Sequence, residues 1–304
     1  MSAMLMKGET WQDANKLVRG KLRFQYPVIA EIKADEIRCR VHSTWDGQGN
    51  RTVHFDSYAG KPLHNMDVFA EQFNRLLGHA GLDELDVGVL VNDNFNDSYR
   101  WVRSANGYPV EKFDKKTGKT APGLQPQDVQ FILFDMPESE AELRDRLAVL
   151  DKINQDAWAF VGLRMNRPHR WYCMTGEAVH DAYTKARAEG HEGIMVKTLD
   201  HVYQRRRTFD WMKYKPSEDH DGQITGFNEA VSIEGQPLGR VGSINVTCAD
   251  GSTAAPSGIP HALGKELWEN QAAYVGQWLE FYCMERDRQG GYRHPIYHRF
   301  REDK

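Results

Sequence analysis

The sequence predicts an α+β domain built from antiparallel sheets and helices, followed by a small all-β domain. Up to residue 216, segments with helical spacing alternate with short runs that are rich in β-branched and aromatic residues. After residue 216 the pattern changes to short strand-like runs separated by glycine turns. We therefore expect one domain over residues 1–216 and a second over 217–304. A chain of 304 residues is long enough to bury a large core and a smaller one.

Three segments of the first domain carry apolar residues at helical spacing, and they are 64–80, 139–153 and 176–190. Ser139 and Glu142 form a capping-box pattern, which predicts that the second of these helices begins at Ser139. Gly190 suits the end of the third helix, because glycine adopts the left-handed conformation of a helix C-terminus without strain.

The stretch "VIAEIKADEIRCRV", residues 28–41, alternates with period two, as strands do. Val28, Ala30 and Ile32 share one face, and Ile29, Glu31 and Lys33 share the other. A second alternation sets Ile37, Cys39 and Val41 against Arg38, Arg40 and His42. Further strands are expected in four short runs, at 86–91, 129–135, 193–197 and 209–215.

Two irregular segments are also expected. Residues 105–128 are polar and rich in glycine, proline and lysine, and the segment is too long for an ordinary connection, which predicts a disordered or functional segment. Residues 217–222, "SEDHDG", are expected to form a hinge before a small five-stranded barrel.

Bulk composition excludes several classes of protein. The sequence is 40% hydrophobic and 27% charged, and it has no apolar run of the roughly 18 residues that a transmembrane helix needs. The first residues lack the apolar core of a signal peptide, and four scattered cysteines without a CxxC pair indicate reduced thiols in a cytoplasm. A net charge of −4 argues against binding nucleic acid by bulk charge, so any such contact must come from local patches.

Four stretches share lysines or arginines beside a carboxylate, and they are 31–38, 191–197, 211–215 and 293–304. Taken singly, each is typical of a half-exposed strand. On a strand, Lys213 and Lys215 point the same way and repel each other unless an anion lies between them. Phosphate is the obvious anion. A lysine such as Lys33 must lose its proton before it can act as a nucleophile.

Taken in order, these stretches resemble the ATP-dependent DNA ligases of the compact bacteriophage kind, within the covalent nucleotidyltransferase superfamily. Residues 33–38, "KADEIR", resemble the family's first motif, K-x-D-G-x-R. Residues 192–197, "EGIMVK", resemble the fourth motif, and residues 211–215, "WMKYK", resemble the fifth. The pattern R-x-P…R-x-D-K, shared by DNA ligases, corresponds to Arg293–Pro295 and Arg301–Lys304. "FILFD", with Phe134, resembles the segment whose aromatic ring stacks on adenine.

The resemblance implies an adenylation domain of the nucleotidyltransferase, ATP-grasp-like kind, followed by an OB-fold. It also implies a three-step reaction: a lysine attacks the α-phosphate of ATP, AMP passes to the 5′-phosphate of a nick, and the 3′-hydroxyl expels AMP. The expected catalytic residues are Lys33, Lys213 and Lys215. The expected nucleotide-binding residues are Glu31, Ile32, Arg38, Phe134, Glu192, Lys197, Arg293, Asp303 and Lys304.

The resemblance also implies Mg²⁺, with Mn²⁺ as an alternative, held by Glu192, Asp35 and Glu36. The expected partner is nicked double-stranded DNA, bound by a cytoplasmic monomer, in the host cytoplasm if the protein is viral. Two basic patches are expected to contact the DNA backbone, and their residues are Arg205, Arg206, Arg207, Lys115, Lys116 and Lys119. Because contacts with the DNA phosphates dominate, the affinity for DNA is expected to fall as the salt concentration rises.

Three positions depart from the family pattern. Glu36 stands where the family has glycine, and Tyr58 stands where the segment S-R-x-G has arginine. The D-G-E-L motif corresponds to 82–91, and its glutamate falls either on Gly88 or on Glu84. One hypothesis is that Glu36 supplies the carboxylate missing at Gly88, and the alternative is that Glu36 is tolerated on an exposed turn. A nick-binding protein with impaired adenylation and an RNA-joining or capping-type nucleotidyltransferase are the rival interpretations.

Overall fold

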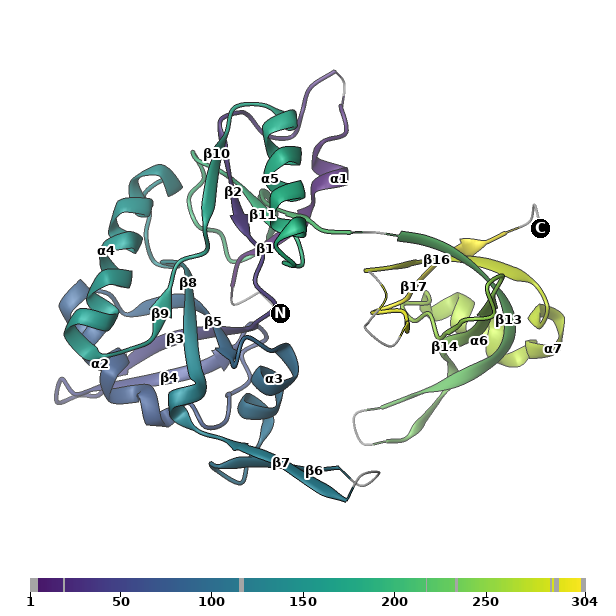
Figure 1. Cartoon of the computed structure of the whole chain (residues 1–304), viewed down its shortest axis with the longest axis horizontal. Helices are drawn as coiled ribbons and strands as arrows, with labels where there is room; N and C mark the ends of the chain where they lie inside the picture. Colours follow the sequence, from purple (N-terminus) through teal and green to yellow (C-terminus); the bar gives the residue numbers. More distant parts are fainter. Residues whose placement is uncertain are drawn as a thin grey trace. The chain divides into compact units, whose positions relative to one another are not determined.

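The computed structural model describes residues 5–18, 20–114, 118–216, 218–232, 235–284, 286 and 290–301. The chain forms two compact units, Met1–Tyr214 and Lys215–Lys304 (Figure 1). The division falls two residues before the expected end of the first domain at residue 216. Within the described residues, no helix is both long enough and apolar enough to cross a membrane.

Two five-stranded sheets and a two-stranded hairpin make up the strands of the first unit. The first sheet has the order β1 (Lys7–Thr10), β12 (Arg207–Tyr214), β11 (Ile194–Thr198), β2 (Val28–Ile32) and β10 (Arg170–Cys173). The second has the order β4 (Arg51–Ser57), β3 (Ile37–Trp45), β5 (Glu84–Val91), β8 (Val129–Asp135) and β9 (Met165–Asn166). Pairing is antiparallel except at β1–β12 and β8–β9. This arrangement confirms the α+β fold class.

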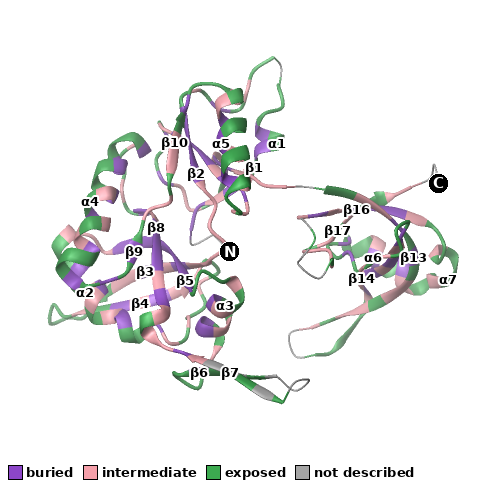
Figure 2. Ribbon diagram, viewed as in Figure 1, coloured by how far each residue is buried: buried purple, intermediate pink, exposed green. Residues whose placement is uncertain are grey.

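The strand pattern over residues 28–41 is confirmed. Cys39 and Val41 of β3 are buried in the core of the second sheet, and Val28 and Ala30 of β2 are buried in the core of the first. Ile29 on the opposite face of β2 is buried too, against Leu143 and Leu147 of a helix, so β2 is covered on both faces. Figure 2 shows the buried residues concentrated on the strands.

The helices of the first unit pack on the outer faces of its sheets. The 3₁₀ turn η1 (Asp67–Phe69) and helix α2 (Ala70–Ala80) correspond to the segment expected at 64–80. Helix α5 (Gly176–Ala188) corresponds to that expected at 176–190, and Gly190 has φ +86° just beyond its end. Sequence reasoning missed α1 (Trp11–Ala14) and α3 (Phe95–Arg103), whose N-caps are the short polar side chains of Thr10 and Asn94.

The expected start of helix α4 is wrong. The helix spans Leu143–Val161, and the Ser139 hydroxyl accepts a hydrogen bond from the backbone of Ala141, which precedes the helix. The reason is tertiary: the first amides of α4, at Leu143 and Arg144, donate to the carbonyls of His201 and Leu199. These carbonyls accept hydrogen bonds from backbone amides that would otherwise need a side-chain cap as their partner.

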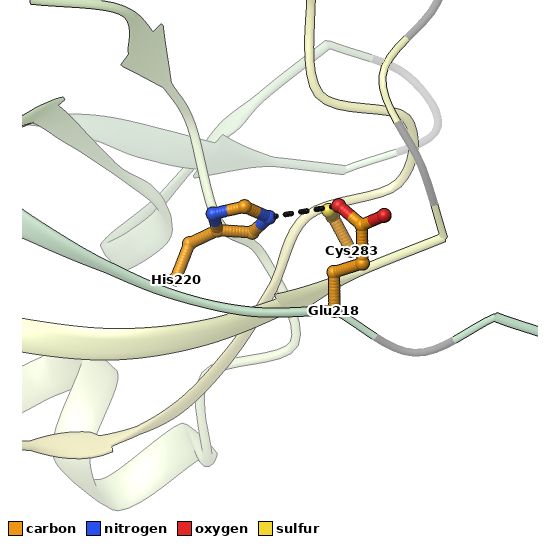
Figure 3. Close-up of side chains that lie close together, drawn as sticks. All are labelled: Glu218, His220 and Cys283. Atoms are coloured by element: carbon orange, nitrogen blue, oxygen red, sulfur yellow. Dashed lines mark hydrogen bonds and ion pairs between the residues drawn. The ribbon is translucent and has the colours of Figure 1, made fainter. Parts of the chain in front are cut away.

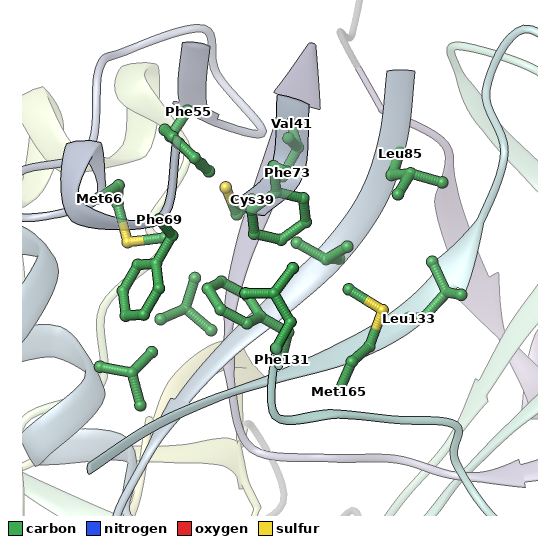
Figure 4. Close-up of a cluster of buried hydrophobic side chains, with 14 of the residues drawn as sticks. Cys39, Val41, Phe55, Met66, Phe69, Phe73, Leu85, Phe131, Leu133 and Met165 are labelled. Atoms are coloured by element: carbon green, nitrogen blue, oxygen red, sulfur yellow. The ribbon is translucent and has the colours of Figure 1, made fainter. Parts of the chain in front are cut away.

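The main core of the first unit lies between the second sheet and helices α2 and α4. Figure 4 shows Phe69, Phe73 and Phe131 together at its centre, with Met66 and Met165 beside them. The rings of Phe69 and Phe73 both meet the Phe131 ring edge-on, with centroids 5.1 and 4.9 Å away. Such edge-to-face contacts fix ring orientation as well as burying area.

Residues 105–128 are not a structureless connection. Strands β6 (Val110–Asp114) and β7 (Lys119–Leu124) pair antiparallel, and the 3₁₀ turn η2 (Pro126–Asp128) follows. Val110 and Leu124 are anchored in the core of the unit. The expectation of disorder is therefore wrong for the described part of this segment, and residues 115–117 lie outside the described residues.

The second unit is a five-stranded antiparallel sheet in the order β15-β14-β13-β16-β17. Its strands are β13 (Glu218–Val231), β14 (Pro237–Cys248), β15 (Thr253–Ala254), β16 (Trp278–Cys283) and β17 (Ile296–Phe300). Ser257 bridges both to Ser243 of β14 and to Ile296 of β17, which joins the two ends of the sheet into a barrel. The OB-like domain expected from the resemblance is thus present.

Two details of the second unit differ from expectation. Helices α6 (His261–Glu269) and α7 (Gln271–Tyr274) were missed, and Leu267 of α6 is fully buried in the barrel core. Residues 218–222, expected as part of a hinge, are the first residues of β13 and pair with β16. Ser217 lies outside the described residues.

Candidate active site

A pocket of about 370 Å³ in the first unit draws its lining from both sheets. Eight residues expected at the site line it: Glu31, Ile32, Lys33, Glu36, Arg38, Phe134, Lys197 and Lys213. Sequence reasoning gave no role in the site to six other lining residues, which are Lys7, Gly8, Ala34, Pro168, Met195 and Trp211. A larger pocket of about 550 Å³ elsewhere in the unit has no lysine or arginine in its lining, so it is poorly suited to a polyphosphate.

Strand pairing places Lys33 beside Glu192. Strands β2 and β11 are antiparallel, with Ile32 opposite Ile194, so the residues just beyond them meet. The Lys33 amide donates to the carbonyl of Gly193 at 2.9 Å, and the Lys33 ammonium donates to the Glu192 carboxylate. Lys33 therefore sits at the end of a strand that is packed on both faces, with its amine held by a largely buried acid.

A buried ion pair forms the floor of the pocket. Lys197 Nζ lies 2.6 Å from Glu31 Oε2, and the two side chains are each only 2% exposed. The same ammonium lies 4.1 Å from the centroid of the Trp211 ring. Arg167 reaches the other oxygen of Glu31 at 3.5 Å. A lysine with an acid and an aromatic face around it is fixed in position, which suits a group that must meet an anion in one place.

The carboxylate of Asp86 fixes the position of the Arg38 guanidinium. Its guanidinium donates to both oxygens of Asp86, and the Tyr203 hydroxyl donates to Asp86 at 2.7 Å. Burial alone would lower the pKa of Arg38, but Asp86 outweighs burial and raises it above the ordinary value. The guanidinium also lies 5.1 Å from the Phe134 ring centroid, so Arg38 and the aromatic wall form one surface.

The side chain of Glu36, which lines the pocket, lies against Gly88 of β5. A Cβ built on Gly88 would lie 2.2 Å from Glu36 Cγ, so the Glu36 side chain fills the space above the glycine. The same Cβ would lie 3.0 Å from an edge atom of Phe134. Burial raises the pKa of Glu36, while Lys33 and Arg38 act to lower it. The alternative that Glu36 stands on an exposed turn is therefore wrong.

The pairing of β3 with β5 also separates the two candidates for the D-G-E-L glutamate. Gly88 lies opposite Arg38, at the pocket, whereas Glu84 lies opposite His42, farther along the strand. Glu84 is buried and bound by both Arg40 and Arg205. Glu84 therefore has a different role from a pocket carboxylate.

Lys7 and Tyr58 form a further part of the pocket wall. Lys7 Nζ lies 4.0 Å from the centroid of the Tyr58 ring, and both residues line the pocket. Lys7 precedes the recognisable motifs by more than twenty residues, so no motif could have indicated it. The pairing of β1 with β12 brings Lys7 to this place.

The remaining expected residues that the structure describes do not line the pocket. Lys215 follows the end of β12 and belongs to the second unit, as does Arg293, and Asp35 is not part of the pocket lining. Arg206 donates to Gln204, and Arg207 lies 3.8 Å from Glu9. Lys115, Lys116, Asp303 and Lys304 lie outside the described residues, as does the side chain of Lys119.

Comparisons with known proteins agree with this geometry. Residues 109–215 match the model of the ATP dependent DNA ligase domain. The DNA ligase of Enterobacteria phage T3 is 32% identical over 133 residues, which cover 41% of this chain and 37% of that protein. The DNA ligase of Escherichia phage T7 is 33% identical over 100 residues, covering 32% of this chain and 27% of that protein. Over residues 109–215 the chain is therefore similar to the ATP-dependent DNA ligase domain.

Solved structures of DNA ligases share this fold. A structure of a Lig E DNA ligase matches 99% of this chain and 100% of that chain with a TM-score of 0.66, at 17% identity. The bacteriophage T7 ligase, solved in complex with ATP, matches 98% of each chain with a TM-score of 0.52, at 20% identity. The sequence matches to the curated relatives span only about a third of their length.

Proposed function

We propose that this protein is an ATP-dependent DNA ligase that joins the 3′-hydroxyl and 5′-phosphate ends of a nick in duplex DNA. The observation that carries the proposal is the pocket in which Lys33 lies among Lys197, Lys213 and Arg38. A cluster of cations around a lysine at the end of a rigid strand suits the transfer of a nucleotide onto that lysine.

In the proposed first step, Lys33 Nζ attacks the α-phosphate of ATP, an N–P bond forms, and the bond to pyrophosphate breaks. The attacking amine must be uncharged, so its proton has to leave first. Glu192 accepts a hydrogen bond from this amine and is therefore placed to take the proton. The product is a lysine–AMP phosphoramidate, from which AMP passes to the 5′-phosphate of the nick.

The other lining residues are proposed to hold the nucleotide. Phe134 offers a ring on which adenine stacks, and Arg38 contacts the sugar or the nick terminus. Lys213 neutralises the α-phosphate, since phosphoryl transfer depends on positioning and charge neutralisation. Glu31 and Ile32 align Lys33 and Lys197 from within β2. Lys215, Arg293, Asp303 and Lys304 stay proposed contacts to the phosphates.

The acidic residues near Lys33 fit a magnesium ion in their chemistry. Glu192 and Glu36 offer hard carboxylate oxygens, which Mg²⁺ prefers. Burial is the main cause that raises the pKa of Glu36, and the negative charge of the nearby Glu192 raises it further. A cation bound between the two carboxylates would offset this repulsion. Asp35 is a third proposed ligand, and Mn²⁺ would suit the same oxygens. When bound, the metal supplies charge neutralisation at the phosphates.

Nicked double-stranded DNA is the proposed partner, bound mainly through its phosphates and without sequence readout. Arg206, Arg207 and the lysines at 115, 116 and 119 stay proposed backbone contacts. Arg205 is a weaker candidate, because both of its terminal nitrogens donate to Glu84. A monomer in the cytoplasm, or in the host cytoplasm for a viral protein, remains the prediction.

The test is incubation of the full chain with radiolabelled ATP, GTP or NAD and Mg²⁺, followed by denaturing electrophoresis. We expect covalent label from ATP alone, its loss in Lys33→Ala, and its retention in the exposed control Lys16→Ala. A labelled chain should then seal a nicked duplex. Label from GTP would favour a capping-type enzyme, and nick binding without any label would favour a nick-binding protein.

A further inference from the structure

The barrel unit carries a side-chain cluster that the proposed ligase reaction does not use. Glu218, His220 and Cys283 each present one ligand atom, and these atoms all lie within 4.8 Å of one another. Figure 3 shows the three side chains converging, with the imidazole donating to the Glu218 carboxylate at 3.2 Å and the Cys283 sulfur beside that carboxylate.

The pairing of two strands creates the cluster. Glu218 and His220 are two apart on β13, so both project from the same face, and Cys283 of β16 lies directly opposite Glu218. The three ligands therefore rest on a hydrogen-bonded ladder and need no loop to bring them together. Tyr292 covers one side, with its ring edge-on to the His220 imidazole at 4.8 Å.

The donor set indicates which metal would fit. One thiolate, one imidazole and one carboxylate are ligands of Zn²⁺, whereas Mg²⁺ takes oxygen ligands. Zinc bonds of about 2.0–2.3 Å place tetrahedral ligand atoms about 3.5 Å apart. The cluster must therefore contract by about 1.3 Å at most, which rotation of the half-exposed Glu218 side chain and the partly buried His220 side chain can provide.

We propose that Glu218, His220 and Cys283 form a zinc-binding site with three protein ligands and one position left for water. On binding, a zinc–sulfur bond forms, the Cys283 thiol releases its proton to solvent, and the His220 ring nitrogen turns from the carboxylate to the metal. No electron is transferred.

The location suggests what the metal would do. Glu218 is the first residue of β13, which follows the connection between the two units, and Cys283 is the last residue of β16. The backbone just beyond Cys283 pairs with Arg293, since the Met284 amide donates to the Arg293 carbonyl at 3.1 Å. A bound zinc would therefore fix the first residue of the barrel to the strand end that leads to a proposed phosphate-binding arginine.

The test uses the full chain, stripped of metal and without ATP or DNA, so that its outcome is independent of ligase activity. Cobalt(II) replaces zinc as the probe, because a cysteinate ligand gives it a charge-transfer absorption band. We expect one equivalent of cobalt to produce this band and zinc to abolish it. Zinc should also raise the Tm, since it binds only the folded barrel.

Variants locate the site. Cys283→Ser and His220→Gln should each weaken binding at least about 100-fold, since the loss of outer partners alone costs about 10–100-fold. Cys248→Ser, which changes another buried cysteine of the same barrel, should bind like the parent chain. The proposal is overturned if the parent chain gives no thiolate band, or if the band persists in Cys283→Ser. It is equally overturned if Cys248→Ser loses the band while His220→Gln keeps it.

Discussion

At the scale of single residues, two departures from the family pattern prove to be one feature. Glu36 replaces a glycine and Gly88 replaces a glutamate, and the Glu36 side chain fills the space that a Gly88 side chain would need. A carboxylate is therefore present at the pocket, but it belongs to Glu36, the residue before β3, and not to a residue of β5. This geometry agrees with the hypothesis of a transferred carboxylate, which remains to be tested by exchange.

Exchanging the two residues is the direct test. Glu36→Gly should slow Lys33–AMP formation by about 10–100-fold, as expected for a lost hydrogen bond to a charged group. Gly88→Glu alone should also impair it, because its side chain would overlap Glu36. The double variant Glu36→Gly/Gly88→Glu should recover most of the rate, measured by labelled ATP. A double variant no better than the worse single variant, or a fully active Glu36→Gly, contradicts the hypothesis.

Lys7 is a second residue whose place only the fold reveals. Because its ammonium lies over Tyr58, it could supply the positive charge that the family's arginine would bring to this segment. Lys7→Ala is expected to reduce nick sealing about tenfold, the lower end of the loss of a charged hydrogen bond. Lys16→Ala, which changes an exposed lysine paired with Asp13, should seal at the parent rate. Equal rates for both variants would remove Lys7 from the site.

At the scale of elements, the join between β8 and α4 depends on a buried ion pair. Arg146 of α4 donates to both oxygens of Asp135, the last residue of β8, and both side chains are fully buried. Arg146 also donates to the carbonyl of His201, and this carbonyl and that of Leu199 accept from the first amides of α4 in place of the expected serine cap. The start of α4 is thus decided by contacts with a segment more than fifty residues away.

Removing the acid from this pair should be costly. Asp135→Asn leaves the Arg146 charge buried without an anionic partner, so we expect it to lower the free energy of unfolding by about 3–5 kcal/mol. Asp13→Asn, which breaks an exposed pair with Lys16, should cost less than about 1 kcal/mol. Urea unfolding at pH 7 measures both. Equal effects would show that Arg146 finds another partner.

The same pair predicts a pH dependence. Burial alone would raise the pKa of Asp135, but the hydrogen bonds and charge of Arg146 outweigh it and hold the pKa below 3.8. The stabilisation is therefore complete above the unfolded pKa and is lost as the pH falls through the lower folded value. In urea unfolding between neutral pH and pH ~3, the free energy of unfolding should fall less steeply with decreasing pH in Asp135→Asn than in the parent chain. Parallel curves would contradict this assignment.

At the scale of the whole molecule, each unit has its own core. The barrel core contains Leu267 of α6 with residues of β13, β14 and β16, and the main core of the first unit contains Leu76 of α2. Separate cores predict two calorimetric unfolding transitions. Leu267→Ala should reduce the free energy of unfolding of the barrel, and Leu76→Ala that of the first unit, each by about 2–5 kcal/mol. Each variant should therefore lower the Tm of one transition. A single transition lowered by both variants would show that the units unfold together.

The sequence by itself determined the fold class, the strands around Lys33, and eight of the residues that line the pocket. It could do so because strand periodicity is local and because the motifs keep their order along the chain. Only the tertiary structure decided that Glu36 lies over Gly88, that Lys7 meets Tyr58, and where α4 begins. These features depend on the register between segments far apart in the sequence, and a shift of one residue would turn every side chain to the other face.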